Sequence, residues 1–352
     1  MAKRKTNQAA EGGYELLKAD LRDGSFRRLY VFFGEERYLL DYYRQQLKKH
    51  LVDGPAEDFN YHRFSEETWD LGAFSEAVEA IPMMSQWSLV EVADVDPFSL
   101  PERDRQELAE LFSALPDYCT VIWDFDTVEW KPDKRMKKLW EALDRAALQV
   151  EFQKQPESQL IPWIRRHLAK EQKTMENDLC RYLILLTGGS MTTLSAEIEK
   201  LVRYSDQPVL TRHDIDAVVI TVMEAAVFDI TRDIGSRNFD GALQKLQNLF
   251  RQDTEPISVN AVIGRQLRQL YGAKVLSEHG KGPAELTRIC GIWDSAAREV
   301  YSQARSMDKQ MLKKAMDWSA QADYAMKTSG GDSEEIVETL LLRLAQAAGG
   351  RQ

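Results

Sequence analysis

The sequence lacks several features that mark common functional classes. Only three cysteines occur in 352 residues, and their odd number and wide spacing argue against a disulfide framework or a zinc site. The five histidines show no metal-ligand spacing. No apolar run approaches the length needed to cross a bilayer, and the basic start of the chain lacks the apolar core of a secretory signal. These absences predict a cytoplasmic protein with no bound metal, no cofactor and no membrane partner.

Positive charge is also scarce in the first part of the chain. The net charge is −10, and residues 1–150 contain 20 Lys and Arg against 29 Asp and Glu, whereas the remaining residues contain 26 against 27. Non-specific binding to DNA needs a basic surface, so the N-terminal region is a poor candidate for it. The hydrophobic content of 43% is typical of a globular protein, and the length suggests two or three domains.

Residues 1–152 alternate short apolar segments with helical stretches, which is the pattern of a parallel α/β sheet. The helix expected near residue 134 follows Pro132-Asp133, a pair that favours a helix start. Strands are expected at residues 29–33, 59–64, 88–92, 120–125 and 148–152, and helices at residues 13–22, 38–50, 71–80, 101–115 and 134–145.

After residue 155 the strand patterns stop. Helical spacing is expected at residues 159–171, 176–186, 192–204 and 211–219, with starts at Asn177, Thr192 and Thr211. Thr211 and Asp214 also have the spacing of a capping box. The chain remains helical from residue 224 to residue 348. The sequence therefore predicts an α/β domain at residues 1–152, a small helical domain at residues 153–221 and a larger helical domain at residues 222–352.

The first expected strand leads into a turn that resembles part of a nucleotide-binding fold. Gly34 ends the strand, and helical spacing resumes after Glu35 and Glu36. A phosphate-binding loop would read G-x-x-x-x-G-K-[ST] and would hold phosphates with its backbone N–H groups and its lysine. Here no Gly-Lys-Ser/Thr follows, and the two carboxylates occupy the place of the phosphate charge. The turn is either an ordinary α/β opening or an ATPase-like module without its ATP site.

A second segment has an unusual apolar composition. Pro82 cannot continue the preceding helix and restricts Ile81, so the residues after it should project from a bend. Met83 and Met84 are adjacent and point in different directions, so both cannot easily enter one core face. Exposed methionine is an adaptable binding group. From the residues alone, the segment either packs in the core or forms an exposed binding surface.

Several passages together resemble the delta subunit of the bacterial DNA polymerase III clamp loader, a member of the AAA+-like clamp-loader family. The order of α/β module, small helical domain and larger helical domain matches the module, lid and collar of that family. The passages that carry the resemblance are residues 29–40 (LYVFFGEERYLL), 80–94 (AIPMMSQWSLVEVAD), 160–168 (LIPWIRRHL), 194–204 (LSAEIEKLVRY), 227–235 (VFDITRDIG), 323–328 (DYAMKT) and 336–344.

The resemblance implies a subunit of the DNA polymerase III holoenzyme that itself has no ATPase activity. Such a subunit binds the ring-shaped sliding clamp, the beta subunit, and helps open it for loading onto primed DNA. Its partners are the gamma/tau and delta-prime subunits in a hetero-pentamer, and these partners bind ATP. Gly34, Glu35 and Glu36 then form a vestigial nucleotide loop. Ile81, Pro82, Met83 and Met84 correspond to the clamp-binding element, where the family commonly has Leu or Phe.

Acidic residues near the expected strand ends offer a weak argument for a metal. The strand at residues 88–92 lacks the Asp-Glu pair with which an active ATPase would hold magnesium, and Asp94 has no neighbouring glutamate. Asp124 and Asp126 alternate with aromatic residues, and they belong to the next strand along the chain. The sequence therefore favours no metal site at these positions.

Two other motifs have ordinary alternatives. Residues 284–300 imitate a helix-turn-helix with Gly291 at the turn, which would place the second helix in a DNA groove. Trp293, Ala296 and Val300 instead follow core spacing, which favours a pair of collar helices. The strongest basic cluster favours a solvated helix face over a DNA-backbone contact. The cluster comprises Lys131, Lys134, Arg135, Lys137 and Lys138.

Overall fold

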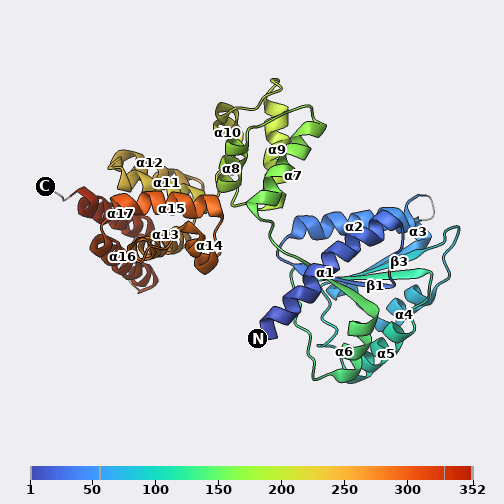
Figure 1. Ribbon diagram of the computed structural model, residues 1–352. Coiled ribbons are helices and arrows are strands. Elements are labelled where there is room, and N and C mark those ends of the chain that lie inside the picture. Colours follow the sequence, from blue (N-terminus) through green and yellow to red (C-terminus); the bar gives the residue numbers. More distant parts are fainter. Residues whose placement is uncertain (1, 55–56, 329, 350–352) are drawn as a thin grey trace. The chain divides into compact units, whose positions relative to one another are not determined.

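The structure, a computed structural model, describes residues 2–54, 57–328 and 330–349. It divides into two compact units, Met1–Lys154 and Gln155–Gln352 (Figure 1). All strands of the described residues lie in the first unit, and the second unit is helical. The expected change from an α/β pattern to a helical pattern near residue 155 is therefore confirmed. The division of the second unit into a lid and a collar stays a prediction.

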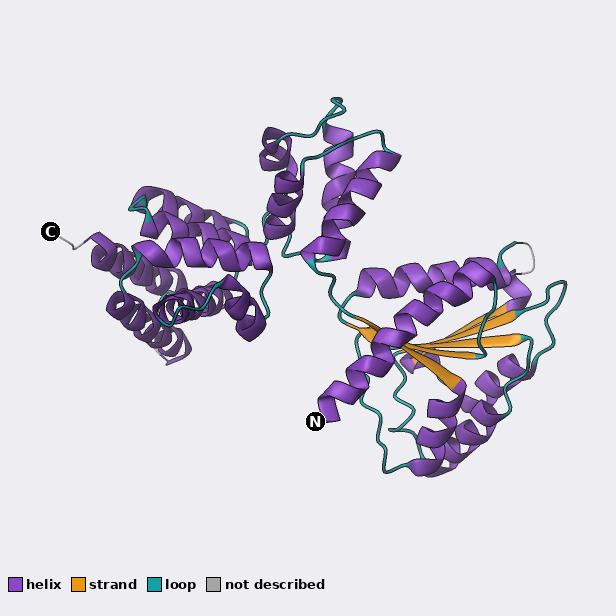
Figure 2. Cartoon of the chain, viewed as in Figure 1, coloured by secondary structure: helices purple, strands orange, loops and turns teal. Residues whose placement is uncertain are grey.

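The first unit is built on one five-stranded sheet with the strand order β2-β3-β4-β1-β5. All of its strand pairs are parallel, and Figure 2 shows helices on both faces of the sheet. Parallel neighbours need crossover connections, which the intervening helices supply. The strands are β1 (Leu29–Gly34), β2 (Tyr61–Ser65), β3 (Ser88–Ala93), β4 (Cys119–Asp124) and β5 (Ala147–Phe152).

Two groups of helices cover this sheet, α1 and α2 on one face and α4, α5 and α6 on the other (Figure 1). The core on the second face contains Val31, Val92 and Trp123 from the strands and Phe74 and Leu108 from the helices. The helices are α1 (Ala2–Asp23), α2 (Arg37–Val52), α3 (Glu57–Asn60), α4 (Leu71–Glu79), α5 (Glu102–Ser113) and α6 (Lys137–Ala146).

Three sequence expectations in this unit are wrong. The helix expected at residues 13–22 already begins at Ala2. The strand expected at residues 59–64 begins only at Tyr61, because Phe59 and Asn60 complete the short helix α3. The helix expected from residue 134 begins at Lys137. The carboxylate of Asp133 accepts hydrogen bonds from the backbone N–H and from the guanidinium of Arg135. These bonds hold a local turn, so Asp133 does not cap α6.

In the second unit, four helices come first and seven follow among the described residues. The capping box of Thr211 and Asp214 is confirmed, whereas α9 is capped by Ser190 instead of Thr192, and α8 begins at Asn177 with Glu176 at its N-cap. The helices are α7 (Glu157–Lys170), α8 (Asn177–Leu186), α9 (Met191–Tyr204), α10 (Arg212–Val218), α11 (Met223–Gly235), α12 (Phe239–Arg251), α13 (Pro256–Glu278), α14 (Pro283–Cys290), α15 (Asp294–Ser306), α16 (Lys309–Thr328) and α17 (Ser333–Gly349).

The long helix α13 lies in the core of the later helices. Its buried residues include Val259, Ile263 and Leu270. Gly264 allows α16 to approach closely, because a Cβ atom at this position would lie 2.9 Å from the hydroxyl oxygen of Ser319. Since α13 is buried over most of its length, substitutions along it should affect the packing of several helices at once.

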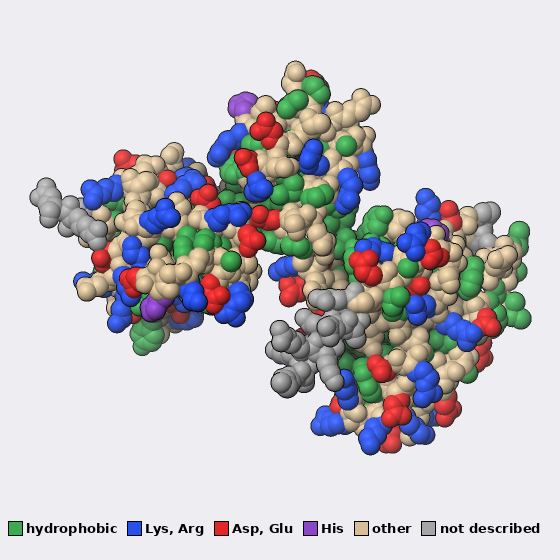
Figure 3. Space-filling view, viewed as in Figure 1, with side chains coloured by type: hydrophobic (Ala, Val, Ile, Leu, Met, Phe, Trp, Pro, Cys, Tyr) green, Lys and Arg blue, Asp and Glu red, His purple; other side chains and the backbone are tan. Residues whose placement is uncertain are grey.

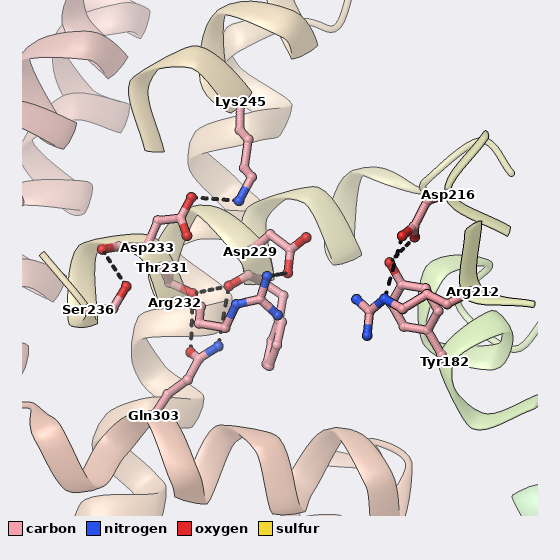
Figure 4. Close-up of polar contacts among 11 residues, drawn as sticks. Tyr182, Arg212, Asp216, Asp229, Thr231, Arg232, Asp233, Ser236, Lys245 and Gln303 are labelled. Atoms are coloured by element: carbon pink, nitrogen blue, oxygen red, sulfur yellow. Dashed lines mark hydrogen bonds and ion pairs between the residues drawn. The ribbon is translucent and has the colours of Figure 1, made fainter. Parts of the chain in front are cut away.

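Polar contacts tie α11 to its neighbours α12 and α15 (Figure 4). Lys245 on α12 pairs with Asp233 at 2.5 Å. Gln303 on α15 donates a hydrogen bond to the carbonyl of Phe228 and lies 3.4 Å from the hydroxyl of Thr231. These contacts give the buried Asp233 and Gln303 side chains polar partners, and they link the three helices. None of the described helices combines the length and the apolar composition of a membrane span.

Candidate functional site

The segment between α4 and β3 carries a group of large apolar side chains that the fold leaves in solvent. Ile81 is 78% exposed, Met83 is 56% exposed and Met84 is 91% exposed. Pro82, between them, is partly buried. Single exposed apolar residues are common, but several in one loop mark an interaction surface. The alternative that this loop packs in the core is therefore wrong.

The loop has a defined backbone. Met84 adopts a φ of 56°, in the left-handed region that residues with a side chain rarely occupy. The side chain of Asn60, from the end of α3, makes two hydrogen bonds with the backbone of Met83. Further along, the backbone N–H of Trp87 donates to the hydroxyl of Ser85 at 3.2 Å. Local hydrogen bonds thus hold the loop in place on both sides of Met84.

Both ends of the loop are anchored in the α/β core. Phe74 and Val78 of α4 are fully buried, and Asp70 caps the helix by accepting a hydrogen bond from the N–H of Ala73 at 2.7 Å. The phenol of Tyr118 donates to the carbonyl of Glu79, the last residue of α4. The apolar side chains therefore project from a rigid support. Figure 3 shows hydrophobic side chains at the outer edge of this unit, beyond the labels α3 and β3 of Figure 1.

The turn that resembles a nucleotide loop lies at the opposite, carboxyl edge of the sheet. Only Glu35 and Glu36 separate the end of β1 from the start of α2. Gly34 has a φ of 129°, and a Cβ atom there would lie 2.4 Å from the carbonyl oxygen of Phe152. The same carbonyl accepts a hydrogen bond from the N–H of Glu36 at 2.9 Å. The backbone of β5 thus lies directly against this turn.

The charged side chains of this turn pair within the protein. Glu35 pairs with Lys154 at 3.1 Å, and Arg37 pairs with Asp126 at 2.8 Å. Glu36 is buried at the N-cap position of α2 but makes no side-chain capping hydrogen bond. The carboxylate of Glu35 is therefore neutralised by Lys154 within the same unit.

Asp94 closes the carboxyl edge of the sheet by binding backbone N–H groups. Its carboxylate accepts hydrogen bonds from the N–H groups of Asp126, Thr127 and Val128 at 2.8–3.0 Å. Burial alone would raise the pKa of Asp94, but these hydrogen bonds outweigh burial and lower it. Asp94 therefore acts as a structural acceptor that fixes the loop after β4.

Asp124 is buried beneath α2, and its carboxylate lies 3.5 Å from the guanidinium of Arg44. Burial raises the pKa of Asp124 to about 7, against the opposing attraction of Arg44. Glu91, on the same side of the sheet, accepts a hydrogen bond from the phenol of Tyr61 at 2.8 Å. Among the described residues, no group of three or more potential ligand side chains could hold a metal ion.

The helix-turn-helix-like segment forms part of the helical core. Gly291 ends α14 in the left-handed conformation. Val300 of α15 is buried as expected, but Ala297 is buried in place of Ala296, and Trp293 is only partly buried. Arg288 pairs with Glu285 at 2.5 Å, so the positive charge of Arg288 is neutralised within the segment. The N–H and the hydroxyl of Ser295 both donate to Glu157 of α7. This arrangement supports the expected helix pair.

The basic cluster around residues 131–138 is partly neutralised as well. Lys131 pairs with Glu129 at 2.5 Å, and Arg135 pairs with Asp133 at 2.7 Å. The ammonium group of Lys134 lies 4.8 Å from the ring centre of Trp140. Exposed pairs of this kind contribute little stability, and they leave a mixed surface in place of a basic patch.

The sequence reasoning missed two residues beside the apolar loop. Phe59 is 58% exposed, and Asn60 is almost fully buried. Both lie at the end of α3, at positions that the sequence pattern assigned to a strand. Glu57 and Asp58 form the acidic first turn of this helix, a start signal that could have revealed it. The contact of Asn60 with Met83 joins positions 23 residues apart, and no local pattern predicts it.

Comparisons with known proteins link this architecture to one family. Residues 30–153 match the family model described as DNA polymerase III, delta subunit, and residues 224–344 match the model of the C-terminal domain of that subunit. The chain is 28% identical over 332 residues to DNA polymerase III subunit delta of Bacillus subtilis, covering 92% of this chain and 94% of the relative.

Two further matches agree with this result. A probable DNA polymerase III subunit delta of Aquifex aeolicus is 20% identical over 297 residues, covering 81% of this chain and 82% of the relative. The solved structure of the clamp loader delta protein of Bacillus subtilis superimposes with a TM-score of 0.58 at 25% identity, covering 94% of this chain and 98% of that one.

Proposed function

The chain belongs to the DNA polymerase III delta-subunit family, and from this membership we propose that it binds the sliding clamp and helps to open it during clamp loading. The binding element is the loop that contains Ile81, Pro82, Met83 and Met84. Membership in the family supports a place in a clamp-loader complex. The identity of the clamp as the bound partner, and of this loop as its contact, is our proposal.

One observation carries the assignment of the site. Met84 is 91% exposed and Ile81 is 78% exposed, although both belong to a loop whose ends are rigid. Leaving large apolar side chains in water provides no folding stability, because the hydrophobic gain comes from removing apolar area from water. Inserting them into an apolar pocket of the clamp would recover that gain. A few such buried anchors carry most of the free energy of a protein–protein contact.

Clamp opening requires more than binding. A subunit favours the open ring only when its contacts are better satisfied in the open ring than in the closed one. We propose that Met83 and Met84 anchor the loop while the adjacent helix α4 presses on the clamp near its subunit interface. The rigid packing of Phe74 and Val78 supports this role, because a force can pass to the clamp only through an element that does not yield.

The remaining parts of the chain have supporting roles in this proposal. Residues 153–221 act as the helical lid, and residues 222–352 act as the collar that assembles with the gamma/tau and delta-prime subunits. Those partners bind ATP and drive the cycle on primed DNA. The two-residue connection between β1 and α2 supports the absence of ATPase activity in this chain, because a phosphate cradle needs a longer glycine-rich loop. ATP hydrolysis by the isolated chain would contradict it.

The test is a calorimetric titration of the full chain with the sliding clamp of the same organism. For the double variant Met83→Ala/Met84→Ala we expect affinity to fall on the order of 100-fold, because two central anchors are removed. Thermal unfolding should stay unchanged, since both side chains are already exposed. Ile289→Ala is the matched control: it removes a side chain that is 59% exposed in the helical unit and should leave the affinity unchanged.

The outcomes separate the parts of the proposal. No binding by the unchanged chain overturns the function. Binding that survives the double substitution overturns the site. Opening is measured separately, by the rate at which closed clamps leave circular DNA when the chain is added. A chain that binds tightly without raising that rate contradicts the opening role alone.

A further inference from the structure

We propose that Asn60 is a positioning residue for clamp binding, which holds the loop of residues 81–84 in the conformation that presents its apolar side chains. This inference rests on the proposed function, because it concerns the same loop and the same partner. Asn60 lies outside the loop in the sequence and does not itself present a surface, since it is 1% exposed. It therefore acts through Met83 and Met84.

The side chain of Asn60 satisfies both backbone polar groups of Met83. Its amide nitrogen donates to the Met83 carbonyl at 2.8 Å, and its amide oxygen accepts from the Met83 N–H at 2.7 Å. A side-chain amide is the group that can donate and accept in this geometry at once. The paired bonds replace those that a strand or helix would supply, at a residue that belongs to neither.

The pairing at Met83 explains how Met84 keeps its unusual backbone. A φ of 56° at a methionine is less favourable than extended or helical backbone, because the side chain is crowded by the neighbouring carbonyl oxygen. Such a residue persists only where the surroundings determine its conformation. On one side of Met84, Asn60 fixes the preceding peptide group. Without that contact, Met84 would relax toward the ordinary regions, and both methionine side chains would change direction.

Asn60 is itself held in place by its neighbours. Lys48 on α2 pairs with Glu57 at 2.8 Å, and its ammonium group lies 3.4 Å from the ring centre of Tyr61. Tyr61 begins β2 and donates its phenol hydrogen to the buried Glu91. Residues on both sides of Asn60 are therefore tied to the body of the unit. The hydrogen bonds from Asn60 therefore fix the position of the loop relative to the rest of the unit.

The expected consequence is a change in affinity through pre-organisation. If only a fraction of the free molecules presents the loop correctly, the apparent dissociation constant rises in inverse proportion to that fraction. Loss of the two hydrogen bonds in Asn60→Ala should weaken clamp binding about tenfold. The same change should speed exchange of the Met83 amide hydrogen while distant amides keep their protection.

The experiment is a double-mutant cycle measured on the full chain with the sliding clamp. Asn60→Ala is made in the unchanged chain and in Met83→Ala/Met84→Ala, and the affinities of the four proteins are compared. If Asn60 acts through the loop, its substitution has no further effect once the two methionine side chains are gone. Equal effects in both backgrounds would show a general structural role and would overturn the inference.

Asn260→Ala is the matched control, because Asn260 is equally buried and also bonds a backbone carbonyl, that of Ser319. It should lower thermal stability without changing clamp affinity or Met83 exchange. If Asn60→Ala does not fold, Asn60→Asp keeps the acceptor for the Met83 N–H but loses the donor, and it should still speed Met83 exchange. If the unchanged chain binds the clamp and the folded Asn60 variant binds it equally well, the inference about Asn60 is overturned but the proposed function is not. No binding by the unchanged chain overturns both proposals.

Discussion

Two connections of the same sheet, one after β1 and one before β3, differ in length, in packing and in the exposure of their side chains. The connection from β1 to α2 has two residues, with Gly34 against the backbone of Phe152 and the charges of Glu35 paired. The connection from α4 to β3 runs through eight residues, Ala80 to Trp87, and exposes three large apolar side chains. The first leaves little room for a ligand, whereas the second presents a surface for one.

The two connections also lie at opposite edges of the sheet. All strand pairs are parallel, so the turn after β1 is at the carboxyl edge and the loop before β3 is at the amino edge. Ligands of open α/β sheets usually bind beyond the carboxyl ends of the strands. In this chain the carboxyl edge is closed by internal hydrogen bonds to Asp94. The proposed clamp-binding loop thus lies at the edge of the sheet that open α/β folds do not usually use for ligands.

The largest expected effect is a loss of folding stability when a side chain is added at Gly34, in the connection between β1 and α2. Gly34→Ala places a Cβ atom 2.4 Å from the Phe152 carbonyl at a φ of 129°, so we expect a loss of about 3 kcal/mol or more in the free energy of unfolding. Urea titration measures it. Gly12→Ala is the control, because no atom lies within 4 Å of the place its Cβ would take in α1, so it should be near neutral. Unchanged stability in Gly34→Ala would contradict the close packing of this turn.

A smaller effect on folding stability is expected from the titration of Asp124, the buried carboxyl beneath α2. Because the folded-state pKa of Asp124 is about 7 and the unfolded value is about 4, the folded state binds the extra proton between these pH values. The free energy of unfolding should therefore fall by about 1.4 kcal/mol per pH unit as pH rises through this window, and level off above it. Unfolding free energies measured at several pH values check this. Asp124→Asn should flatten the slope, and an equally steep slope in that variant would assign the titration to another group.

The smallest expected effect concerns the second connection. Ile81→Ala should weaken clamp binding about fivefold, as a supporting contact beside two anchors. Its free energy of unfolding should change by less than about 0.5 kcal/mol, because the side chain is 78% exposed. Calorimetry and urea titration measure the two quantities. A large loss of stability with unchanged affinity would show that Ile81 serves folding and not clamp binding, which would contradict the contrast between the two connections.

Local patterns predicted much of this fold for identifiable reasons. The strands β1, β3 and β4 are buried on both faces, and such strands appear as short runs of apolar and β-branched residues. Pro82 marked the end of α4, and the adjacent methionines marked a segment that could not enter one core face. Thr211 and Asp214 marked a helix start through a capping box, which depends on residues three apart.

Other features could not be predicted because they depend on contacts between distant residues. The start of α6 shifts since Asp133 binds Arg135 instead of capping the helix. The raised pKa of Asp124 requires the covering helix α2 and the neighbouring Glu91. The position of the apolar loop depends on Asn60, which lies in a four-residue helix that resembles the start of a strand.

The sequence alone determined the order of the five strands, the shortness of the turn at Gly34 and the place of the apolar segment at residues 81–84. Each of these follows from the conformational limits of glycine and proline or from hydrophobic periodicity, which act over a few residues. Only the tertiary structure decided that the apolar segment lies in solvent and which backbone it adopts. Burial and hydrogen bonding between Asn60 and Met83 arise when the folded chain brings distant residues together.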